Sequence, residues 1–394
     1  MKKLRNILTY NKEKCAGCYA CVNACPQKCI SMEINREGFR YPEVDHSKCI
    51  KCGNCVDICP VVDKMIVQSD PVAYACINKD ESIRMESSSG GIFTLLAEQI
   101  ITDGGIVFGV GFNKKFEVEH SYIETKKDLD KFRGSKYVQS KIGETYKQAK
   151  EFLEEGRKVL FTGTPCQIGG LRSYLKKYYK NLFCVDIVCH GVPSPTVWKK
   201  YIEYREEIAQ SPIQRICFRN KNKGWKKYSV SFWFENNTEY RQTLDKDPYM
   251  IAFLKDVCLR PSCYACKFKS LYRQGDITLG DFWGIENILP ELDDNKGVSL
   301  VLVNSNNGKD MLKKIKSEIL CYKVNLGDVV RYNSSIIKPV VYNSKRRVFF
   351  EELGVIKFDK LVKKHCSDNT FLMIKKKTKY LLRGILSRLE LLFK

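Results

Sequence analysis

The chain has 394 residues, of which 44% are hydrophobic and 28% charged, and its net charge is +22. These values are ordinary for a globular protein of two or three domains, and the chain is too long for its nineteen cysteines to form a secreted disulfide scaffold. No apolar run reaches the about eighteen residues of a membrane span, and no secretory signal follows the first methionine, so we expect a cytoplasmic protein.

Two tandem runs with the pattern Cys-x-x-Cys-x-x-Cys-x-x-x-Cys-Pro occupy residues 15–60. This spacing binds iron–sulfur clusters in bacterial ferredoxins, where the fourth cysteine of each run ligates the other cluster. We therefore predict two [4Fe-4S] clusters, one on Cys15, Cys18, Cys21 and Cys59, the other on Cys49, Cys52, Cys55 and Cys25. Zinc knuckles or disulfides are the alternative, which both spacings and both prolines disfavour.

The same region has further local signals. Gly17 and Gly53 are expected to let the two cysteine loops fold close to their clusters. Cys29 lies outside the first run, and we expect it not to be a ligand. A polar stretch around residues 68–71 predicts a linker, so the ferredoxin-like domain is placed at residues 1–70.

The next segment predicts a buried strand over 72–78 and an amphipathic helix over 92–101. Small residues precede this helix, namely Ser88, Ser89, Gly90 and Gly91. Their backbone N–H groups could bind a phosphate, although a plain serine N-cap explains the same pattern. Strands are expected over 106–112 and 117–123. A second candidate for anion binding follows at 133–140 and contains Gly134, Ser135 and Lys136.

Alternating strands and helices follow, with strands at 158–162 and 182–188 and helices at 167–178 and 197–208. This order favours an α/β core with a site at the strand ends. Cys166 and Cys189 each stand where a strand ends. A thiolate at the start of a helix is stabilised, which suits a metal ligand or a reactive thiol, while a buried structural cysteine is the alternative.

The pattern then becomes antiparallel over 213–244, followed by a helix over 248–257. Cys263-x-x-Cys266 is a weak motif alone. Read with Cys166 and Cys189, it gives four thiolates from three segments, enough for a third [4Fe-4S] cluster. Cys258 is the competing candidate. A strand over 299–303 and a helix over 309–317 complete the core.

Six motifs resemble, in this order, the coenzyme F420 hydrogenase/dehydrogenase beta-subunit family. They begin at Ser88 (Ser-Ser-Gly-Gly), Gly134 (Gly-Ser-Lys-Tyr-Val), Thr162 (Thr-Gly-Thr-Pro-Cys-Gln), Asp186 (Asp-Ile-Val-Cys-His-Gly), Arg260 (Arg-Pro-Ser-Cys-Tyr-Ala-Cys) and Gly275 (Gly-Asp-Ile-Thr-Leu-Gly-Asp-Phe-Trp-Gly). The resemblance covers about residues 72–350, behind the ferredoxin-like domain. It implies a fold of the α+β or α/β class, with a mixed-sheet FAD and iron–sulfur domain formed by 71–150 and 151–330.

The resemblance also implies a site. FAD would lie beside the third cluster, with its phosphates at Ser88–Gly91 and Gly134–Lys136 and with Asp281 and Trp283 lining the cavity. Cys166, Cys263 and Cys266 would bind the cluster, with Cys189 as the fourth ligand. Lys136 or Arg133 could stabilise a reduced flavin, and His190 could donate a proton or be structural.

The predicted function is that of an oxidoreductase. Electrons would pass from ferredoxin or another acidic redox protein through the clusters to FAD, which converts single electrons into pairs for a small two-electron acceptor. Many fused relatives in bacteria accompany surface-polysaccharide genes, which puts coenzyme F420 in doubt as the acceptor and leaves the acceptor open, with a compound of such a pathway as one possibility. The alternative is an electron-transfer subunit that feeds a partner reductase and has no small-molecule site.

The C-terminal region, residues 331–394, carries sixteen Lys or Arg against five Asp or Glu, half of the net charge. We predict a basic helical extension here. Its last residues, 371–394, are amphipathic and could either lie on the inner membrane face or pack on their own domain. No nucleic-acid-binding motif accompanies the charge, so nucleic acid is not an expected partner.

Overall fold

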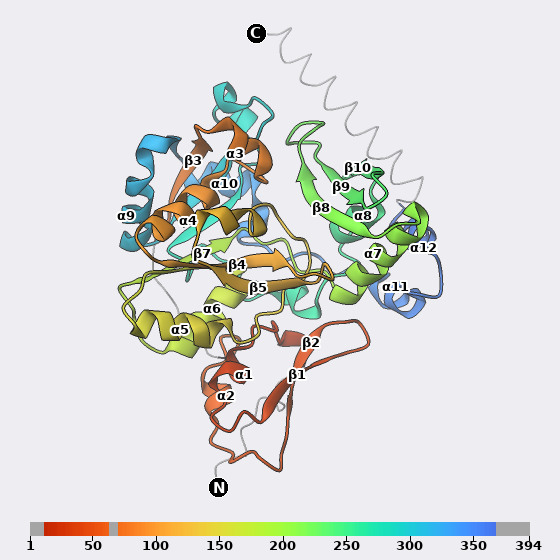
Figure 1. Ribbon diagram of the computed structural model, residues 1–394, viewed down its shortest axis with the longest axis horizontal. Coiled ribbons are helices and arrows are strands. Elements are labelled where there is room, and N and C mark those ends of the chain that lie inside the picture. Colours follow the sequence, from red (N-terminus) through yellow and green to blue (C-terminus); the bar gives the residue numbers. More distant parts are fainter. Residues whose placement is uncertain (1–11, 63–69, 368–394) are drawn as a thin grey trace, which may run out of the picture.

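The computed structural model describes residues 12–62 and 70–367. Figure 1 shows a small N-terminal domain that projects from one side of a larger α/β body. The amphipathic segment 371–394 lies outside the described residues. Among the helices of the described ranges, none combines the length and the apolar character that crossing a membrane requires.

The N-terminal domain contains a two-stranded antiparallel sheet, β1 (Ile30–Ile34) and β2 (Arg40–Val44), and two short helices, α1 (Ala20–Ala24) and α2 (Asn54–Asp57). Each helix follows a cysteine loop. Four residues of these loops have left-handed φ angles: Gly17 (65°), Tyr19 (64°), Lys51 (56°) and Gly53 (78°). The cysteine spacing aligns Gly17 with Lys51 and Tyr19 with Gly53, so the repeats share a backbone shape and place glycine differently within it.

The body is built on an eight-stranded mixed sheet with the order β13-β3-β12-β11-β7-β6-β4-β5. The four strands β11, β7, β6 and β4 run parallel, and the remaining neighbours are antiparallel. The strand bounds are β3 Val72–Asn78, β4 Ile106–Phe112, β5 Val118–Ile123, β6 Val159–Gly163, β7 Leu182–Ile187, β11 Ile277–Asp281, β12 Ser299–Val303 and β13 Ile319–Val324. Strands from 71–150 and from 151–330 therefore share one sheet.

Helices cover both faces of this sheet, because its strands alternate apolar side chains between two cores. Leu160 of β6 faces the core under α4 (Ile92–Thr102) and α9 (Asn306–Lys314), whereas Phe161 faces the core under α5 (Thr145–Glu154) and α6 (Pro165–Leu175). The helix α6 starts with a capping box of Thr164 and Gln167, which fixes the turn that follows β6.

A second, three-stranded antiparallel sheet lies beside the first: β8 (Ile213–Asn220), β9 (Ser229–Phe234) and β10 (Glu239–Thr243). An aromatic core that includes Trp198, Tyr201 and Phe232 joins it to the neighbouring helices. Those helices are α7 (Pro195–Ala209), α8 (Pro248–Leu254) and α12 (Phe358–Cys366). The remaining helices are α3 (Glu81–Glu86), α10 (Leu326–Tyr332) and α11 (Arg346–Glu352).

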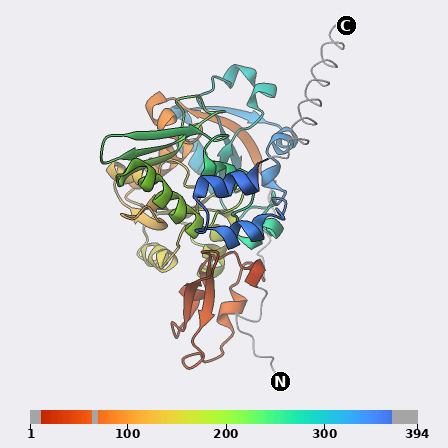
Figure 2. The same cartoon turned by 90° about the vertical axis from the view of Figure 1, so that its right-hand side faces the viewer.

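The N-terminal domain docks on the body at two places. Its helix α1 packs against α6. On the other side, Arg346 of α11 donates two hydrogen bonds of 2.6 Å to the carboxylate of Glu37 in the β1–β2 turn. Figure 2 shows the C-terminal helices, in blue, directly above this domain.

Candidate functional site

The first cysteine set consists of Cys15, Cys18, Cys21 and Cys59, which line one cavity of about 230 Å³. Burial raises the pKa of the Cys18 thiol well above its usual value, and the neighbouring thiols Cys21, Cys59 and Cys15 raise it further. The structure therefore brings together the four cysteines predicted for one cluster. Four cysteines that line one cavity can all be ionised when a metal cation offsets their charge, which iron supplies in a [4Fe-4S] cluster.

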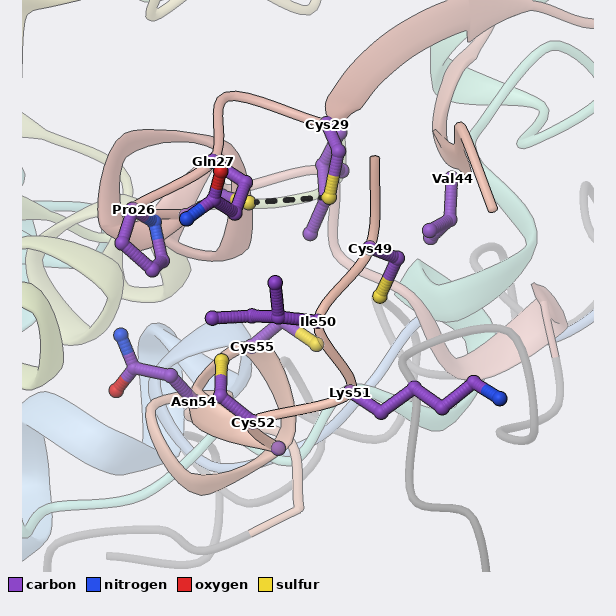
Figure 3. A pocket seen from close by; sticks show the side chains of 13 residues that line it. Pro26, Gln27, Cys29, Val44, Cys49, Ile50, Lys51, Cys52, Asn54 and Cys55 are labelled. Carbon is purple, nitrogen blue, oxygen red and sulfur yellow. Dashed lines mark hydrogen bonds between the residues drawn. The ribbon is translucent and has the colours of Figure 1, made fainter. Parts of the chain in front are cut away.

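The second set lines a smaller cavity in the same domain. Figure 3 shows side chains from the Cys25–Cys29 and Cys49–Cys55 segments around it. The predicted ligands Cys25, Cys49, Cys52 and Cys55 all lie on its wall. So does Cys29, whose Sγ is 3.4 Å from Sγ of Cys25. Cys29 was expected outside the ligand set, and sequence spacing gave no signal that it shares this cavity.

The third set comes from three separate segments of the body. Cys166 lies in the first turn of α6, Cys189 follows β7, and Cys263 and Cys266 lie in and just after the 3-10 helix η4 (Pro261–Ala265). Burial raises the pKa of Cys166 to about 12, and the thiol of Cys266, followed by that of Cys189, raises it further. Cys263 and Cys266 act on Cys189 in the same way. All four predicted thiols are therefore neighbours.

Three cations surround this third set. Arg260 lowers the pKa of Cys166 and Cys263 against the dominant effect of burial. Lys269 and Arg273 do the same for Cys189, and the Lys269 ammonium also donates to the Cys189 carbonyl. Two buried arginines and a half-buried lysine beside four thiols suit an anionic metal–thiolate centre.

Cys258 lies in different surroundings. It is fully buried in the aromatic core, where Cys366 is the neighbour that most raises its pKa after burial itself.

In the described ranges, no three His, Cys, Asp or Glu side chains converge closely enough to hold a single metal ion. A cluster differs from a single ion in that it spaces its ligand sulfurs apart.

Helix α6 connects the first and third sets. Cys166 occupies its N-terminal turn, and Gly170 faces Cys18 of the first set so closely that a Cβ there would meet the Cys18 sulfur at 3.1 Å. Four helical residues rise about 6 Å along the axis. The two sets therefore sit close together along one helix.

The two loops predicted to bind phosphate also meet. The Ser135 backbone N–H and hydroxyl both hydrogen-bond to the Ser88 hydroxyl, at 2.7 and 2.8 Å. Gly91 is the N-cap of α4 and has a φ of 84°. Gly134, with a φ of 81°, has open space where a side chain would be.

Several donors in these loops are already paired within the protein. The Gly90 N–H donates to the Ser299 hydroxyl at 2.9 Å, and the Ser89 hydroxyl donates to the Val298 carbonyl at 2.7 Å. The Lys136 ammonium donates to two carbonyls at 3.0 Å, while burial lowers its pKa to about 7. Gly90 and Ser89 thus anchor the loop to β12 rather than present free donors.

Asp281 and Trp283 lie close to the same loops. Arg219 donates to both carboxylate oxygens of Asp281, at 2.7 and 3.0 Å, and to the Ser88 carbonyl at 3.0 Å. Trp283 is partly exposed and stacks on the buried ring of Trp225 with a centroid distance of 4.8 Å. The Arg219 Nε atom is buried without a hydrogen-bond partner.

His190 has a partner of its own. Its Nε2 lies 2.6 Å from a carboxylate oxygen of Asp256, and its ring meets Phe253 edge-on. This pair holds the segment after Cys189 against α8. Sequence reasoning did not find Arg219 or Arg260 as site residues, because an arginine gives no sign in the sequence that it will be buried.

Comparison with known proteins identifies the domains of the chain. Residues 14–62 match the 4Fe-4S dicluster domain, so the N-terminal domain is of the ferredoxin type and binds iron–sulfur clusters. Residues 73–146 and 156–326 match the N-terminal and C-terminal domains of the coenzyme F420 hydrogenase/dehydrogenase beta subunit. Together these matches cover more than half of the chain, which therefore belongs to the coenzyme F420 hydrogenase/dehydrogenase beta-subunit family.

Individual known proteins match either a short part of the chain or most of it at low identity. NADH-quinone oxidoreductase subunit I 2 of Geobacter metallireducens is 43% identical over 60 residues, 14% of this chain and 45% of that protein. Ketoisovalerate oxidoreductase subunit VorC of Methanothermobacter marburgensis is 36% identical over 69 residues, 17% of this chain and 85% of VorC. An uncharacterised protein of Methanocaldococcus jannaschii is 23% identical over 363 residues, 80% of this chain and 90% of its own length.

A solved structure also resembles the chain. It is a chain of the F420-reducing [NiFe] hydrogenase complex from Methanosarcina barkeri, with 18% identity and a TM-score of 0.47. The match covers 75% of this chain and 96% of the hydrogenase chain.

Proposed function

We propose that this protein is an iron–sulfur flavoprotein oxidoreductase. It takes single electrons from a ferredoxin-type donor and passes them through its two N-terminal clusters to a third cluster, to FAD and to a small two-electron acceptor. The observation that carries the proposal is the third cysteine set: four thiols from three segments, next to three cations, beside the first set.

The residues fit a third cluster. Cys166, Cys189, Cys263 and Cys266 would hold it, and the buried cations would balance its charge. When bound, such a cluster supplies one-electron transfer. The chain's part is to hold the first and third sets close to each other, which the packing of Gly170 against Cys18 supports.

The residues also offer an anchor for FAD, whose flavin exchanges one electron with a cluster and two with an acceptor. The meeting of the Ser88 and Ser135 loops, the open space at Gly134 and the unpaired Arg219 Nε support a site there. Trp283, which is 36% exposed, offers an aromatic ring next to these loops. Because Gly90 and Ser89 are engaged with β12, we assign phosphate contacts to Gly134 and its neighbours instead.

The second cavity is the proposed entry for electrons. Ile50, which is 61% exposed, lies on its wall together with Lys51. Lys48 adds a second exposed cation, which forms an ion pair with Asp45 at the surface. An apolar residue beside two exposed lysines fits an acidic redox protein, since opposite charge speeds encounter and orients the partners. Contact of residues 371–394 with the inner membrane face stays a prediction.

Anaerobic purification followed by iron and flavin analysis tests this function. We expect about twelve iron atoms and about one flavin per chain, and about eight iron atoms in a Cys263→Ala, Cys266→Ala variant. Cys321→Ala is the matched control, because Cys321 is a half-buried cysteine on the edge strand β13, away from every set. Wild-type protein with about eight iron atoms and no flavin would contradict the proposal.

A second candidate function is that of an electron-transfer subunit without its own small-molecule site. The printed names of two relatives, subunits of larger oxidoreductases, favour it. The two functions differ in turnover of the isolated chain. With reduced ferredoxin and a panel of quinone, nicotinamide and enone acceptors, an enzyme reduces at least one of them, whereas a subunit turns over only with its partner.

A further inference from the structure

Arg260 occupies the junction between the first and third cysteine sets. It is fully buried, precedes η4 and spans three segments. Its Nε donates to the Cys15 carbonyl at 2.7 Å, and its terminal nitrogens donate to the Gln139 side chain and the Arg40 carbonyl, each at 3.0 Å. One guanidinium therefore connects a cysteine loop of the N-terminal domain with the segment that carries Cys263.

This buried cation has no acidic partner in the described parts of the chain: no Asp or Glu carboxylate there forms an ion pair with it. Glu37, on the nearby β1–β2 turn, is already held by Arg346. Moving a charged side chain from water into the protein interior costs on the order of several kcal/mol unless an opposite charge compensates for it. Arg260 is tied to a cysteine of each set by direct contact: its side chain donates to the Cys15 carbonyl, and its own carbonyl accepts a hydrogen bond from the Cys263 N–H at 2.9 Å.

The packing at this junction is tight. A Cβ on Gly17 would lie 2.7 Å from the Gln139 amide nitrogen and 3.0 Å from the Arg260 guanidinium carbon. At the equivalent place in the second loop, Lys51 adopts the same left-handed backbone with a full side chain. The backbone shape alone therefore does not require glycine at 17. The approach of Arg260 does.

We propose that Arg260 is a positioning residue that couples the first cluster to the third. It fixes their spacing, and as a shared counter-charge it raises the reduction potential of both. The proposal rests on the third cluster of the proposed function. Each transfer moves one electron from a reduced ferredoxin-type donor to an oxidised cluster, and no bond forms or breaks. An added electron makes a cluster more negative, so a nearby fixed cation favours the reduced form.

The test is a redox titration of the full chain, followed by electron paramagnetic resonance. In Arg260→Gln we expect the reduction equilibrium of the first and third clusters to shift at least tenfold toward the oxidised form, which is 59 mV for a one-electron couple. Arg260→Lys should restore part of the shift. The second cluster, which Arg260 does not contact, serves as an internal reference.

The control removes a buried arginine together with its own partner. In Arg346→Gln with Glu37→Gln, a matched ion pair is lost at the same domain interface, and all potentials should stay at the wild-type values. Unchanged first and third potentials in an iron-loaded Arg260→Gln protein would overturn the proposal. If the wild-type protein contains only two clusters, the proposed function is wrong. In that case the reduction potential of the first cluster still tests the role of Arg260 separately.

A second pair of variants covers the case in which Arg260→Gln does not assemble. Gly17→Ala and Gly53→Ala both place a side chain on a left-handed backbone, but only the first meets Arg260, since Gly53 has open space around it. Gly17→Ala should shift the potential of the third cluster, and Gly53→Ala should leave it unchanged. Equal third-cluster potentials in the two variants would overturn the proposal.

Discussion

The fourth ligand of the third set can be decided by two substitutions. Cys189 and Cys258 are both plausible from the sequence, but only Cys189 lies among Cys263 and Cys266. Cys258 is fully buried in the aromatic core beside Cys366. We expect Cys189→Ala to lose about four iron atoms per chain and Cys258→Ala to lose none.

The magnitude of the Cys258→Ala effect follows from its burial. Removing one buried sulfur from a close-packed core costs about 1 kcal/mol, which lowers the melting temperature of a domain of this size by about 2–4 °C. The protein should therefore melt slightly earlier with its full iron content. In Cys189→Ala, by contrast, the iron content and the visible absorbance of the clusters should both fall.

The assay is colorimetric iron analysis and thermal melting, both under anaerobic conditions. Alanine is used instead of serine, because a hydroxyl can still serve as a ligand to iron. Iron loss in Cys258→Ala together with full iron in Cys189→Ala would refute the assignment of the third set.

Three further predictions concern packing, pH and docking. Gly170→Ala should slow electron transfer from the first to the third cluster, measured by rapid-freeze spectroscopy, and destabilise the protein by about 1–3 kcal/mol, because the new methyl group meets Cys18. Burial lowers the pKa of His120 to about 4, so its folded pKa lies below its unfolded value and stability falls as the pH drops from about 6.5 toward 4. Chemical denaturation at pH 7.5 and 5.5 should show a loss of about 1 kcal/mol, absent in His120→Gln. Lys48→Glu with Lys51→Glu should raise the KM for an acidic ferredoxin at least tenfold at low salt and remove most of its salt dependence.

Each of these has a control on the same chain. Ser173→Ala changes a half-buried residue of α6 and should keep the transfer rate. His46→Gln changes an exposed histidine and should keep the pH slope. Lys114→Glu with Lys115→Glu reverses two exposed charges in the β4–β5 turn and should keep the KM. Each prediction is wrong if its control variant behaves like its test variant.

Local signals predicted much of the fold. The strand expected at 72–78 is β3 with the same bounds, and the helix expected at 197–208 is α7, extended to Pro195–Ala209 by a serine cap and a proline in its first turn. The cysteine spacing of 15–60 also identified two thiol sets, because all eight cysteines lie in two short neighbouring repeats that exchange their fourth cysteines. Such patterns are visible because the residues that interact are near each other in the chain.

The remaining features depend on long-range packing. Strand β3 pairs with β12 and β13, more than two hundred residues later, and no local pattern encodes that register. Arg260 and Gly17 likewise meet only when the domains dock. The third cysteine set could be suspected only because its members stand at strand ends and match family motifs. Cys258 was the competing candidate in the sequence, and the fold places it in the aromatic core instead.

The central claim, a relay of three clusters and a flavin, is tested most directly by counting electrons. Anaerobic coulometric titration of the purified full chain measures how many electrons one molecule accepts. Three one-electron clusters and one two-electron flavin predict about five electrons per chain. A value of about two, equal to the N-terminal clusters alone, would contradict the account.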